Sequence, residues 1–409
     1  MSQASEASAP YVRARRATMW ALLLMGAPVG ALLPRLAEVK ASIGASAGSF
    51  GTAVALGALV AIVGNWSGSQ LAHRFGTKRM AQGIFAVMMA ASLGNVLVPN
   101  AAGLSLVSVL GGFGYSLCFI AVNSQGVLVE QHLGKSFLPL MHAFWSLGTV
   151  VTAAASSLAA PYCTPLQALL VCDSVCLVAW AVITRDLLPA HFDQHPHNDP
   201  AQLQAHERIP RDVMRFLLII AVAQWLSLQA EISVADWSSV LMKEDLGIAV
   251  GPNGYGYTTF CIVQLVARLA APRWVDRYGL NTVVRVLGVI GAVGYLAFLT
   301  AATLADSPGK ALVLMCISYG FISLGAAVMQ PGFASAAGAI PGLPSARALM
   351  ITGAVTAVIS VFGRIALAYL AQFTSLPLAL GVMGLFLLGA ALMSQVLHPH
   401  RAAGHAIAR

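Results

Sequence analysis

The sequence predicts an all-α polytopic membrane protein with twelve transmembrane helices, arranged as two halves of six. Only 9% of its 409 residues are charged, and its mean hydropathy is +0.78. A soluble domain carries about 25% charged residues, so a soluble chain of this length could not cover its surface. A second observation is that apolar stretches of roughly 20 residues, the length that spans a bilayer, follow one another along the chain. The third is a short polar turn that occurs twice, about half a chain apart.

The predicted spans form two sets of six with a polar break between them. Their approximate cores are residues 18–37, 49–70, 80–99, 103–128, 138–160, 165–184, 214–235, 253–272, 282–303, 310–335, 347–371 and 377–397. We therefore predict an N-terminal six-helix half (residues 1–184), a cytoplasmic linker (185–213) and a C-terminal six-helix half (214–409). The first span is longer than the apolar region of a typical signal peptide, so it is expected to stay in the mature chain.

The segment 191–197 of the linker contains three histidines, His191, His195 and His197. They could bind a metal, but Pro and Asp lie between them, which favours a solvated linker. The six cysteines lie in or beside apolar stretches and form no CxxC pair. Such cysteines act as small apolar packing residues. No metal, disulfide or cofactor is therefore predicted.

The basic residues are distributed unequally between the two sides of the predicted membrane. Of the 23 Lys and Arg residues, 17 fall on the predicted cytoplasmic side, three on the outer side and three within or near the ends of spans. Because cytoplasmic loops retain Lys and Arg, this distribution predicts that both termini and the linker are cytoplasmic. It also explains the net charge of +8 without a nucleic-acid partner.

The repeated turn is His73-Arg74-Phe75-Gly76 after the second span and Asp276-Arg277-Tyr278-Gly279 after the eighth. The glycines permit a tight turn, and the basic residues hold it on the cytoplasmic side. A fixed motif repeated at half-length indicates a duplicated half, which is how many transporters are built.

This turn, within a plan of six plus six helices, resembles the major facilitator superfamily, whose motif is usually written G-x-L-a-D-r-x-G-r-r. Leu71, Arg74, Gly76 and Lys78-Arg79 fit the motif, whereas His73 stands where the family has an acid. Ser69 likewise replaces the usual glycine. In the family the acid latches the two halves together on the cytoplasmic side. The resemblance therefore implies a gating role for both turns, with the latch retained by Asp276 and weakened at His73.

Three further segments are similar to the bacterial inner-membrane YbjJ-type branch, a distant relative of fucose permeases: Leu33–Lys40, Met141–Gly148 and Glu231–Trp237. The resemblance implies a monomeric, multi-pass secondary transporter of the bacterial inner membrane. The polar residues of the seventh span favour transport of a small polar solute, sugar-like or another small metabolite, by alternating access coupled to protons. The fifth span lacks the G-P-x-x-G-G pattern of proton-driven drug antiporters, which counts against efflux of a drug or natural product but leaves it as the alternative.

Polar residues inside spans are the candidates for transport, because an ionisable group at the bilayer centre costs at least about 2.5–3.5 kcal/mol and normally faces a cavity or a partner. In the superfamily plan the first, fourth, seventh and tenth spans line the cavity. The candidate solute- and proton-binding residues are Arg35, Glu38, Asn123, Gln125, His142, Gln224, Gln229, Glu231, Asp236, Gln330 and Arg364.

The seventh span is the richest of these. Gln224 and Glu231 are seven residues apart and share a helix face, as do Gln229 and Asp236. Trp237 places the end of this span near the outer interface, where Trp anchors. Glu231 is deeper among apolar neighbours, where burial favours the protonated carboxyl. We therefore predict that Glu231 couples transport to protons.

Arg35 and Arg364 are the predicted exchange partners of Glu231 when its proton leaves. The alternative is a permanently ionised Glu231 in a structural pair. Arg268, close to the second turn, is expected to pair with that motif between the halves; the alternatives are that it binds an anionic solute or neutralises a carboxylate. Arg35 and Glu38, at i and i+3, could equally form a local salt bridge.

Three other residues leave alternatives open. His142 could relay protons or bond a sugar hydroxyl, or serve as a packing histidine. Gln330 precedes Pro331-Gly332, which predicts a helix break whose freed carbonyls face a cavity. Asp173, in a span that is usually scaffold, is either satisfied by a polar neighbour or protonated in place.

Other functional classes lack support in the sequence. No G-x-x-x-x-G-K-[ST] motif is present, so ATP drive from this chain is not predicted. A membrane enzyme usually displays paired acids or His-rich motifs at a helix end, and none is found, so we predict no catalytic residues and no enzyme. A sensor with a transporter fold remains a further alternative, which binding without solute flux would reveal.

Overall fold

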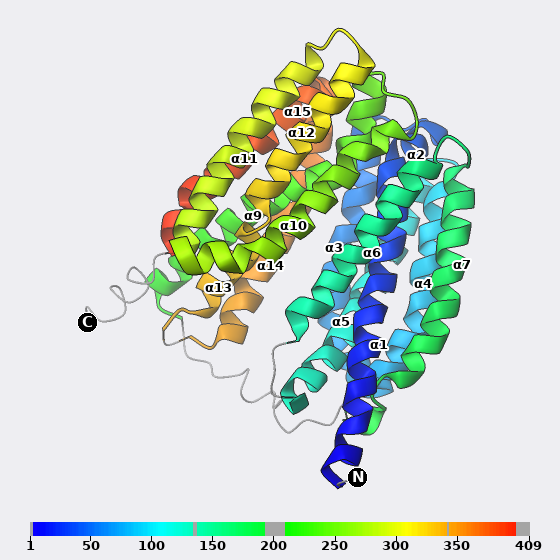
Figure 1. Cartoon of the computed structure of the whole chain (residues 1–409), viewed down its shortest axis with the longest axis vertical. Coiled ribbons are helices and arrows are strands. Elements are labelled where there is room, and N and C mark those ends of the chain that lie inside the picture. Colours follow the sequence, from blue (N-terminus) through cyan, green and yellow to red (C-terminus); the bar gives the residue numbers. More distant parts are fainter. Residues whose placement is uncertain (1–2, 134–136, 193–208, 342, 398–409) are drawn as a thin grey trace. The chain divides into compact units, whose positions relative to one another are not determined.

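The computed structural model describes residues 3–133, 137–192, 209–341 and 343–397, and the regular secondary structure of these residues is entirely helical (Figure 1). The predicted all-α fold is confirmed. The chain divides into two compact units, Met1–His197 and Asn198–Arg409. His195 and His197 of the predicted linker lie outside the described residues.

The described residues of the first unit form six long helical segments. They are α1 (Gln3–Leu32) continued by η1 (Leu33–Arg35) and α2 (Leu36–Ser42), then α3 (Ala47–Phe75), α4 (Thr77–Leu97), α5 (Ala101–Leu133), α6 (Leu138–Ala159) and α7 (Pro165–Ile183). Two short 3₁₀ turns, η2 (Thr184–Asp186) and η3 (Ala190–Phe192), follow α7.

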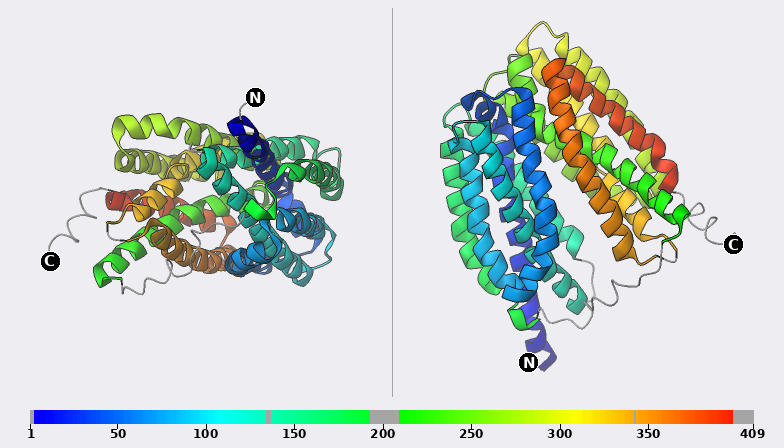
Figure 2. Two further views of the ribbon diagram at one scale, coloured as in Figure 1. Left: turned by 90° about the horizontal axis from the view of Figure 1, so that it is seen from below. Right: turned by 180° about the vertical axis from the view of Figure 1, so that it is seen from behind.

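The second unit repeats this plan. Its helices are α9 (Arg211–Val240), α10 (Tyr255–Tyr278), α11 (Leu280–Thr303), α12 (Pro308–Ala326), α13 (Met329–Gly338), α14 (Ser345–Phe373) and α15 (Leu376–Leu392). Three short helical turns accompany these helices. α9 is extended by η4 (Leu241–Asp245), α10 is preceded by η5 (Pro252–Gly254), and α15 is extended by η6 (Met393–Leu397). Five helices, α10 and α12–α15, pack against α9, and Figure 2 shows α14 in orange beside α9 in green.

One predicted span differs from the others in polarity. In the described part of the chain, eleven helices are long and apolar enough to cross a membrane. The predicted eighth span, α10, is a helix of 24 residues but is not among them. It carries Gln264, Arg268 and Arg273 ahead of the Asp276-Arg277 turn. Gln264 and Arg268 require partners within the protein, because lipid offers none, whereas Arg273 is exposed near the end of the helix.

The two copies of the repeated turn adopt the same backbone. Gly76 has φ 80° and Gly279 has φ 79°, and the N–H of each donates at 2.8 Å to the carbonyl four residues earlier. This left-handed conformation is open to glycine at no steric cost. The guanidinium of Arg74 lies 5.5 Å from the Phe75 ring centre, and that of Arg277 lies 5.3 Å from Tyr278. The local structure therefore repeats, side chains included.

In the first unit, α1 and α6 approach closely along a row of small residues. A Cβ added at Gly26 would lie 2.3 Å from the Trp145 carbonyl oxygen, and one added at Gly30 would lie 2.2 Å from the Thr149 carbonyl oxygen. From the other side, a Cβ at Gly148 would lie 2.2 Å from the Leu23 carbonyl oxygen. The two backbones are therefore in contact, as small residues at helix interfaces in membranes allow.

Hydroxyl groups of α6 complete this contact, which we call the α1–α6 seam. Three of them donate to carbonyl oxygens of α1: Thr149 to Gly26 at 3.2 Å, Thr152 to Ala27 at 2.7 Å, and Ser156 to Ala31 at 2.7 Å. Each bond between transmembrane helices contributes on average about 0.6 kcal/mol. The seam is thus held mainly by close packing, with the hydroxyls satisfied inside it.

Candidate functional site

Helix α9 buries an unusual number of polar side chains. Gln224, Ser227, Gln229, Ser233 and Asp236 are all buried within the protein. A buried polar group costs free energy unless it is hydrogen-bonded. The partners of these side chains therefore show which parts of α9 serve structure and which retain unused bonding capacity.

Glu231 of α9 forms a cluster with two residues of α10. Its Oε1 accepts a hydrogen bond from Gln264 Nε2 at 2.5 Å and one from Arg268 Nη2 at 3.2 Å. Gln264 and Arg268 are four residues apart, so both project from the same face of α10. The polarity of α10 is thus explained by this cluster of carboxylate, amide and guanidinium.

The described partner of Glu231 is a residue that the sequence analysis did not propose for it. We expected Arg35 or Arg364, but the described ion pairs of these two arginines are with Glu38 and Asp236. Arg268 was expected to pair with the turn motif between the halves or, as an alternative, to neutralise a carboxylate. Its described ion pair is with Glu231 of its own unit, and pairing between the halves stays a prediction. Arg268 is the partner of Glu231 because α10 packs against α9 and brings the two side chains together.

Asp236, five residues beyond Glu231, points to a different helix. Its Oδ2 lies 3.4 Å from Nε of Arg364 on α14, an ion pair without hydrogen-bond geometry at that nitrogen. The adjacent Trp237 is only 2% exposed. The expectation that Trp237 anchors at a lipid interface is therefore wrong, because its indole packs inside the protein.

Buried polar groups without partners gather where α9 faces α14. Neither amide atom of Gln229 has a hydrogen-bond partner among the described residues, nor has Nε1 of Trp225 or Oγ of Ser360. A Cβ added at Gly363 would lie 2.7 Å from Oε1 of Gln229 and 3.1 Å from Nε1 of Trp225. Gly363 thus gives both side chains room beside α14. We call Trp225, Gln229, Ser360 and Gly363 the α9–α14 polar seam.

The tenth span is interrupted, as the sequence predicted at Pro331. Helix α12 ends at Ala326 and α13 begins at Met329, so the break lies just before Gln330. Pro331 has no N–H to donate to the carbonyl four residues earlier, which favours a break there. Nε2 of Gln330 donates to the Gln224 carbonyl at 2.6 Å and to Oγ of Ser227 at 2.8 Å. Gln330 therefore ties α13 to α9.

The candidate residues at the end of the first span form a local cluster. Arg35 is fully buried and pairs with Glu38, with Nη2 2.9 Å from Oε2. The same Nη2 donates to the Cys163 carbonyl at 2.8 Å. The pair therefore joins the first span to the segment between α6 and α7, as the local salt-bridge alternative expects.

The candidates of the fourth and fifth spans have separate surroundings. Gln125 is fully buried, and its Nε2 donates to Oγ1 of Thr77 at 2.7 Å and to the Leu188 carbonyl at 2.9 Å. Its Oε1 accepts from the Leu188 N–H at 2.8 Å, so this side chain is a structural clamp. Asn123 donates to the Phe119 carbonyl of its own helix at 2.8 Å. His142 is exposed, with its ring 5.8 Å from that of Phe119.

Asp173 of α7 is fully buried. Ser92 on α4 is its polar neighbour. Neither carboxyl oxygen of Asp173, however, makes a hydrogen bond of normal geometry. In the turns, His73 and Asp276 are exposed in their own units. The gating roles of His73, Arg74, Gly76, Asp276, Arg277 and Gly279 stay predictions.

Four residues of the site were missed by sequence reasoning: Gln264, Trp225, Ser360 and Gly363. Gln264 carried a signal, because it lies one turn before Arg268 within a predicted membrane span. The other three carried none, because a Trp, a Ser and a Gly inside apolar helices are ordinary residues until their neighbours are known.

Comparisons with known sequences place the chain in a family. Residues 18–337 match the Major Facilitator Superfamily. An uncharacterized transporter of Sinorhizobium fredii is 25% identical over 381 residues, covering 92% of this chain and 96% of the relative. An uncharacterized MFS-type transporter of Yersinia pestis is 24% identical over 393 residues, covering 94% and 95%.

Solved structures show the same fold. The nucleoside transporter NupG superposes with a TM-score of 0.69 at 14% identity, covering 94% of this chain and 98% of that one. A D-xylose–proton symporter superposes with a TM-score of 0.74 at 13% identity, covering 94% and 97%. At such identities the likeness establishes the fold alone. The family match, which spans well over half of the sequence, establishes that this chain belongs to the Major Facilitator Superfamily of membrane transporters.

Proposed function

We propose that this protein is a secondary active transporter that moves a small polar solute across the bacterial inner membrane by alternating access, coupled to protons through Glu231. It works as a monomer with both termini in the cytoplasm, and within the superfamily it resembles the YbjJ-type branch. The observation that carries the proposal is the cluster of Glu231 with Arg268 and Gln264 in the membrane-spanning part of the second unit.

The cluster is suited to proton coupling because it links two helices through a charge that a proton can cancel. When Glu231 is ionised, the charge-assisted bonds to Arg268 and Gln264 hold α9 to α10. When Glu231 is protonated, the ion pair is lost and the contact weakens. A carboxyl that exchanges protons with one side and then the other thereby biases the packing of the helices that carry it.

Exposure favours Glu231 over Asp236 for this role. The Glu231 and Arg268 side chains are 15% and 34% exposed, whereas those of Asp236 and Arg364 are 9% and 19% exposed. Removing one charge of a buried pair costs about 3–5 kcal/mol when the other is left buried and unpaired. Arg268 can turn part of its guanidinium toward water, so this cost is smaller for the Glu231 pair.

The α9–α14 polar seam supports a polar solute. A solute hydroxyl both donates and accepts, and the seam offers both functions: amide and hydroxyl groups at Gln229 and Ser360, and an N–H donor at Trp225. An apolar drug would leave these groups unpaired, which favours uptake of a polar metabolite over drug efflux. The same fold serves a D-xylose–proton symporter and a nucleoside transporter.

The solute can be found by a thermal-shift screen of the purified protein against sugars, sugar acids, peptides and antibiotics, because a ligand that binds the native state raises its melting temperature. With that solute, proteoliposomes containing Glu231→Gln should retain counterflow exchange and lose proton-driven accumulation, since Gln mimics the protonated acid. The matched control is Asp306→Asn, which removes the acid of an exposed ion pair with Lys310. This variant should retain both counterflow exchange and proton-driven accumulation. Accumulation by Glu231→Gln at the parent level would show that Glu231 does not couple.

The proposed orientation has its own test. Reporter fusions at residue 200 and at the C-terminus should be active with a cytoplasmic reporter and silent with a periplasmic one. The reverse result at either fusion point would contradict the arrangement of two six-helix halves with an internal linker.

A further inference from the structure

Asp173 of α7 is a buried acid for which the proposed transport mechanism has no use. Its side chain has no exposed surface, and neither carboxyl oxygen has a hydrogen-bond partner among the described residues. Asp173 lies eight residues after the first residue of α7, Pro165, and ten before the last, Ile183. At the rise of an α-helix it is therefore about 12 Å from the nearer end, deep in a membrane span.

The contact between α7 and α4 can be followed residue by residue. At one end, Lys78 Nζ donates to the Leu187 carbonyl at 3.0 Å, and Gln82 Nε2 donates to the Thr184 carbonyl at 3.3 Å. Residue numbers rise along α4 as they fall along the other segment, so the two segments run antiparallel. These polar side chains of α4 are hydrogen-bonded to the segment that follows α7.

Further along, the same contact brings Asp173 to Ser92. The Trp180 ring stacks on the Phe85 ring with centres 3.8 Å apart. Asp173 lies seven residues before Trp180 and Ser92 lies seven after Phe85, which is two turns along the same face of each helix. Ser92 is the polar side chain beside the carboxyl, and its Oγ also lacks a hydrogen-bond partner among the described residues. An unpartnered carboxyl thus faces an unpartnered hydroxyl.

In the described part of the first unit, no opposite charge lies beside Asp173. Residues 19–33 of α1 and 80–97 of α4 contain no ionisable side chain, and the titratable neighbours on α7 itself are the thiols of Cys172 and Cys176. The described charged side chains of the elements packed against α7, together with one histidine, lie outside these stretches: Arg13, Arg15 and Arg16 of α1, Lys78 and Arg79 of α4, His142 of α6, and Arg185 and Asp186 of η2. Because an isolated carboxylate is far costlier to bury than a neutral carboxyl, these surroundings favour the protonated group.

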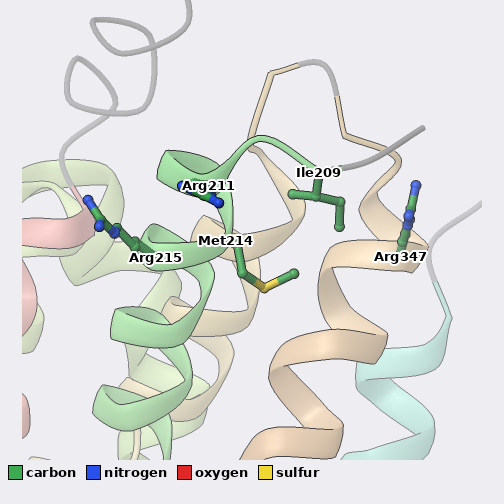
Figure 3. A pocket seen from close by; sticks show the side chains of 5 residues that line it. All are labelled: Ile209, Arg211, Met214, Arg215 and Arg347. Atoms are coloured by element: carbon green, nitrogen blue, oxygen red, sulfur yellow. The ribbon is translucent and has the colours of Figure 1, made fainter. Parts of the chain in front are cut away.

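Other charged side chains of the protein have different surroundings. Arg211 and Arg215, at the start of α9, are exposed beside a hollow of about 600 Å³ (Figure 3). Glu231 and Asp236 are largely buried, but each has an arginine as its ion-pair partner. Asp173 has neither solvent nor an arginine.

We propose that Asp173 is a proton-binding site of the first unit, in which a neutral carboxyl shares its proton with Oγ of Ser92 and so joins α7 to α4. A neutral carboxyl has one O–H donor and a carbonyl acceptor, and a serine hydroxyl both donates and accepts, so the pair can satisfy both groups. Protonation supplies the donor that a carboxylate lacks. This proton is held in the scaffold and is independent of the coupling proposed for Glu231.

Infrared spectroscopy of the full-length protein in proteoliposomes tests the proposal, because the carbonyl stretch of a neutral carboxyl is separate from the carboxylate and amide bands. At neutral pH the parent should show such a band, and Asp173→Asn should lose it, since the amide keeps the size and a donor but has no acid proton. The control is Asp186→Asn, which removes an exposed acid just after α7 and should keep the band. Identical neutral-carboxyl bands in the parent and Asp173→Asn would overturn the proposal.

Ser92→Ala tests the shared proton, and it does so even if Asp173→Asn fails to fold. This variant keeps the carboxyl and removes its partner, so the band should move to higher frequency, as a carboxyl band does when a hydrogen bond is lost. Isotope labelling of the aspartate carboxyls separates this band from those of glutamates. The absence of any aspartate band of the neutral form in the parent would refute the proton site, and an unmoved band in Ser92→Ala would refute the bond to Ser92.

Discussion

The first and fifth spans of each half pack together, and the two resulting seams differ in what they do with their polar groups. In the α1–α6 seam, glycines bring the backbones into contact and the α6 hydroxyls bond to α1 carbonyls. The α9–α14 contact repeats one such bond, from Thr356 Oγ1 to the Ala221 carbonyl at 3.2 Å. Further along, however, Gly363 makes room for the amide of Gln229 instead of for backbone.

This difference separates a closed contact from one with unused hydrogen-bonding capacity. One copy of the contact is closed by direct backbone approach. The other carries polar atoms with unused bonding capacity and is flanked by the ion pairs of Glu231 and Asp236. Unpaired buried polar groups destabilise a fold, so each of them calls for a reason other than stability. The comparison supports the proposal that the first seam is scaffold and that the second contacts the solute.

The largest effect is expected from closing the space in the α1–α6 seam. Gly30→Leu places a side chain where even a Cβ would lie 2.2 Å from the Thr149 carbonyl oxygen. Because backbone cannot yield as a flexible side chain does, we expect at least about 3 kcal/mol of destabilisation or no folded protein. Gel filtration and thermal melting measure this.

The matched control for this variant is Gly83→Ala on α4, where an added Cβ meets nothing within 4 Å. It should fold as well as the parent, or slightly better because alanine favours helix. Normal folding of Gly30→Leu would show that the α1–α6 seam can open. It would contradict the distinction between a closed first seam and an adaptable second one.

A smaller effect is expected from the glycine of the second seam. Gly363→Ala places a methyl group 2.7 Å from Oε1 of Gln229, which is the end of a movable side chain. We expect roughly 1–2 kcal/mol of destabilisation, because Gln229 can shift, together with at least tenfold weaker binding of the solute found by the screen. Thermal melting and titration with the solute give the two values. Unaltered affinity would place the solute elsewhere.

Gln229→Leu should separate stability from function most clearly. Leucine keeps the approximate volume and removes an amide that lacks partners, and such a group costs about 1–3 kcal/mol when buried. The melting temperature should therefore stay the same or rise, while solute affinity falls. Thr152→Val in the first seam removes a satisfied hydroxyl and should lower stability by about 0.6 kcal/mol without changing affinity. If both variants lose stability equally, the two seams are alike.

Local features could be predicted from the sequence, and contacts between helices could not. Span lengths, the repeated turn at Gly76 and Gly279 and the break before Gln330 depend on residues that are neighbours in the chain. The partner of Glu231 depends on which face of α10 meets α9, which composition does not encode. Gln125 was chosen as a solute residue because it is polar within a span, yet Thr77 and Leu188 engage its amide.

Statistical preferences of residue types also led to wrong expectations. Trp237 follows an acid at the end of a span, which is where interfacial Trp residues occur, but its indole is buried. Only one residue of the α9–α14 polar seam was a candidate from the sequence. Gln229 was chosen for its residue type, whereas Trp225, Ser360 and Gly363 became relevant only through the packing of α9 against α14. Whether a buried amide has a partner is a property of the fold.

The smallest effect on stability is expected at the turns, the other place where the halves differ. His73 and Asp276 occupy the same position of the repeated turn, and both are exposed. A neutral imidazole cannot supply the charge that the acid supplies, and a protonated one would repel Arg74. The family resemblance therefore implies a latch that is weaker on the side of His73.

His73→Asp restores the acid, and since surface substitutions usually change stability by less than about 0.5 kcal/mol, the melting temperature should hardly move. The conformational population should nevertheless shift toward the outward-facing state, because a ligand-free equilibrium responds to any contact that favours one state. Cysteine labelling at the predicted cytoplasmic mouth should slow in this variant, with His73→Asn as the uncharged control. If labelling is the same in both variants and the parent, the turn serves only to orient the chain, and the two halves differ at their seams alone.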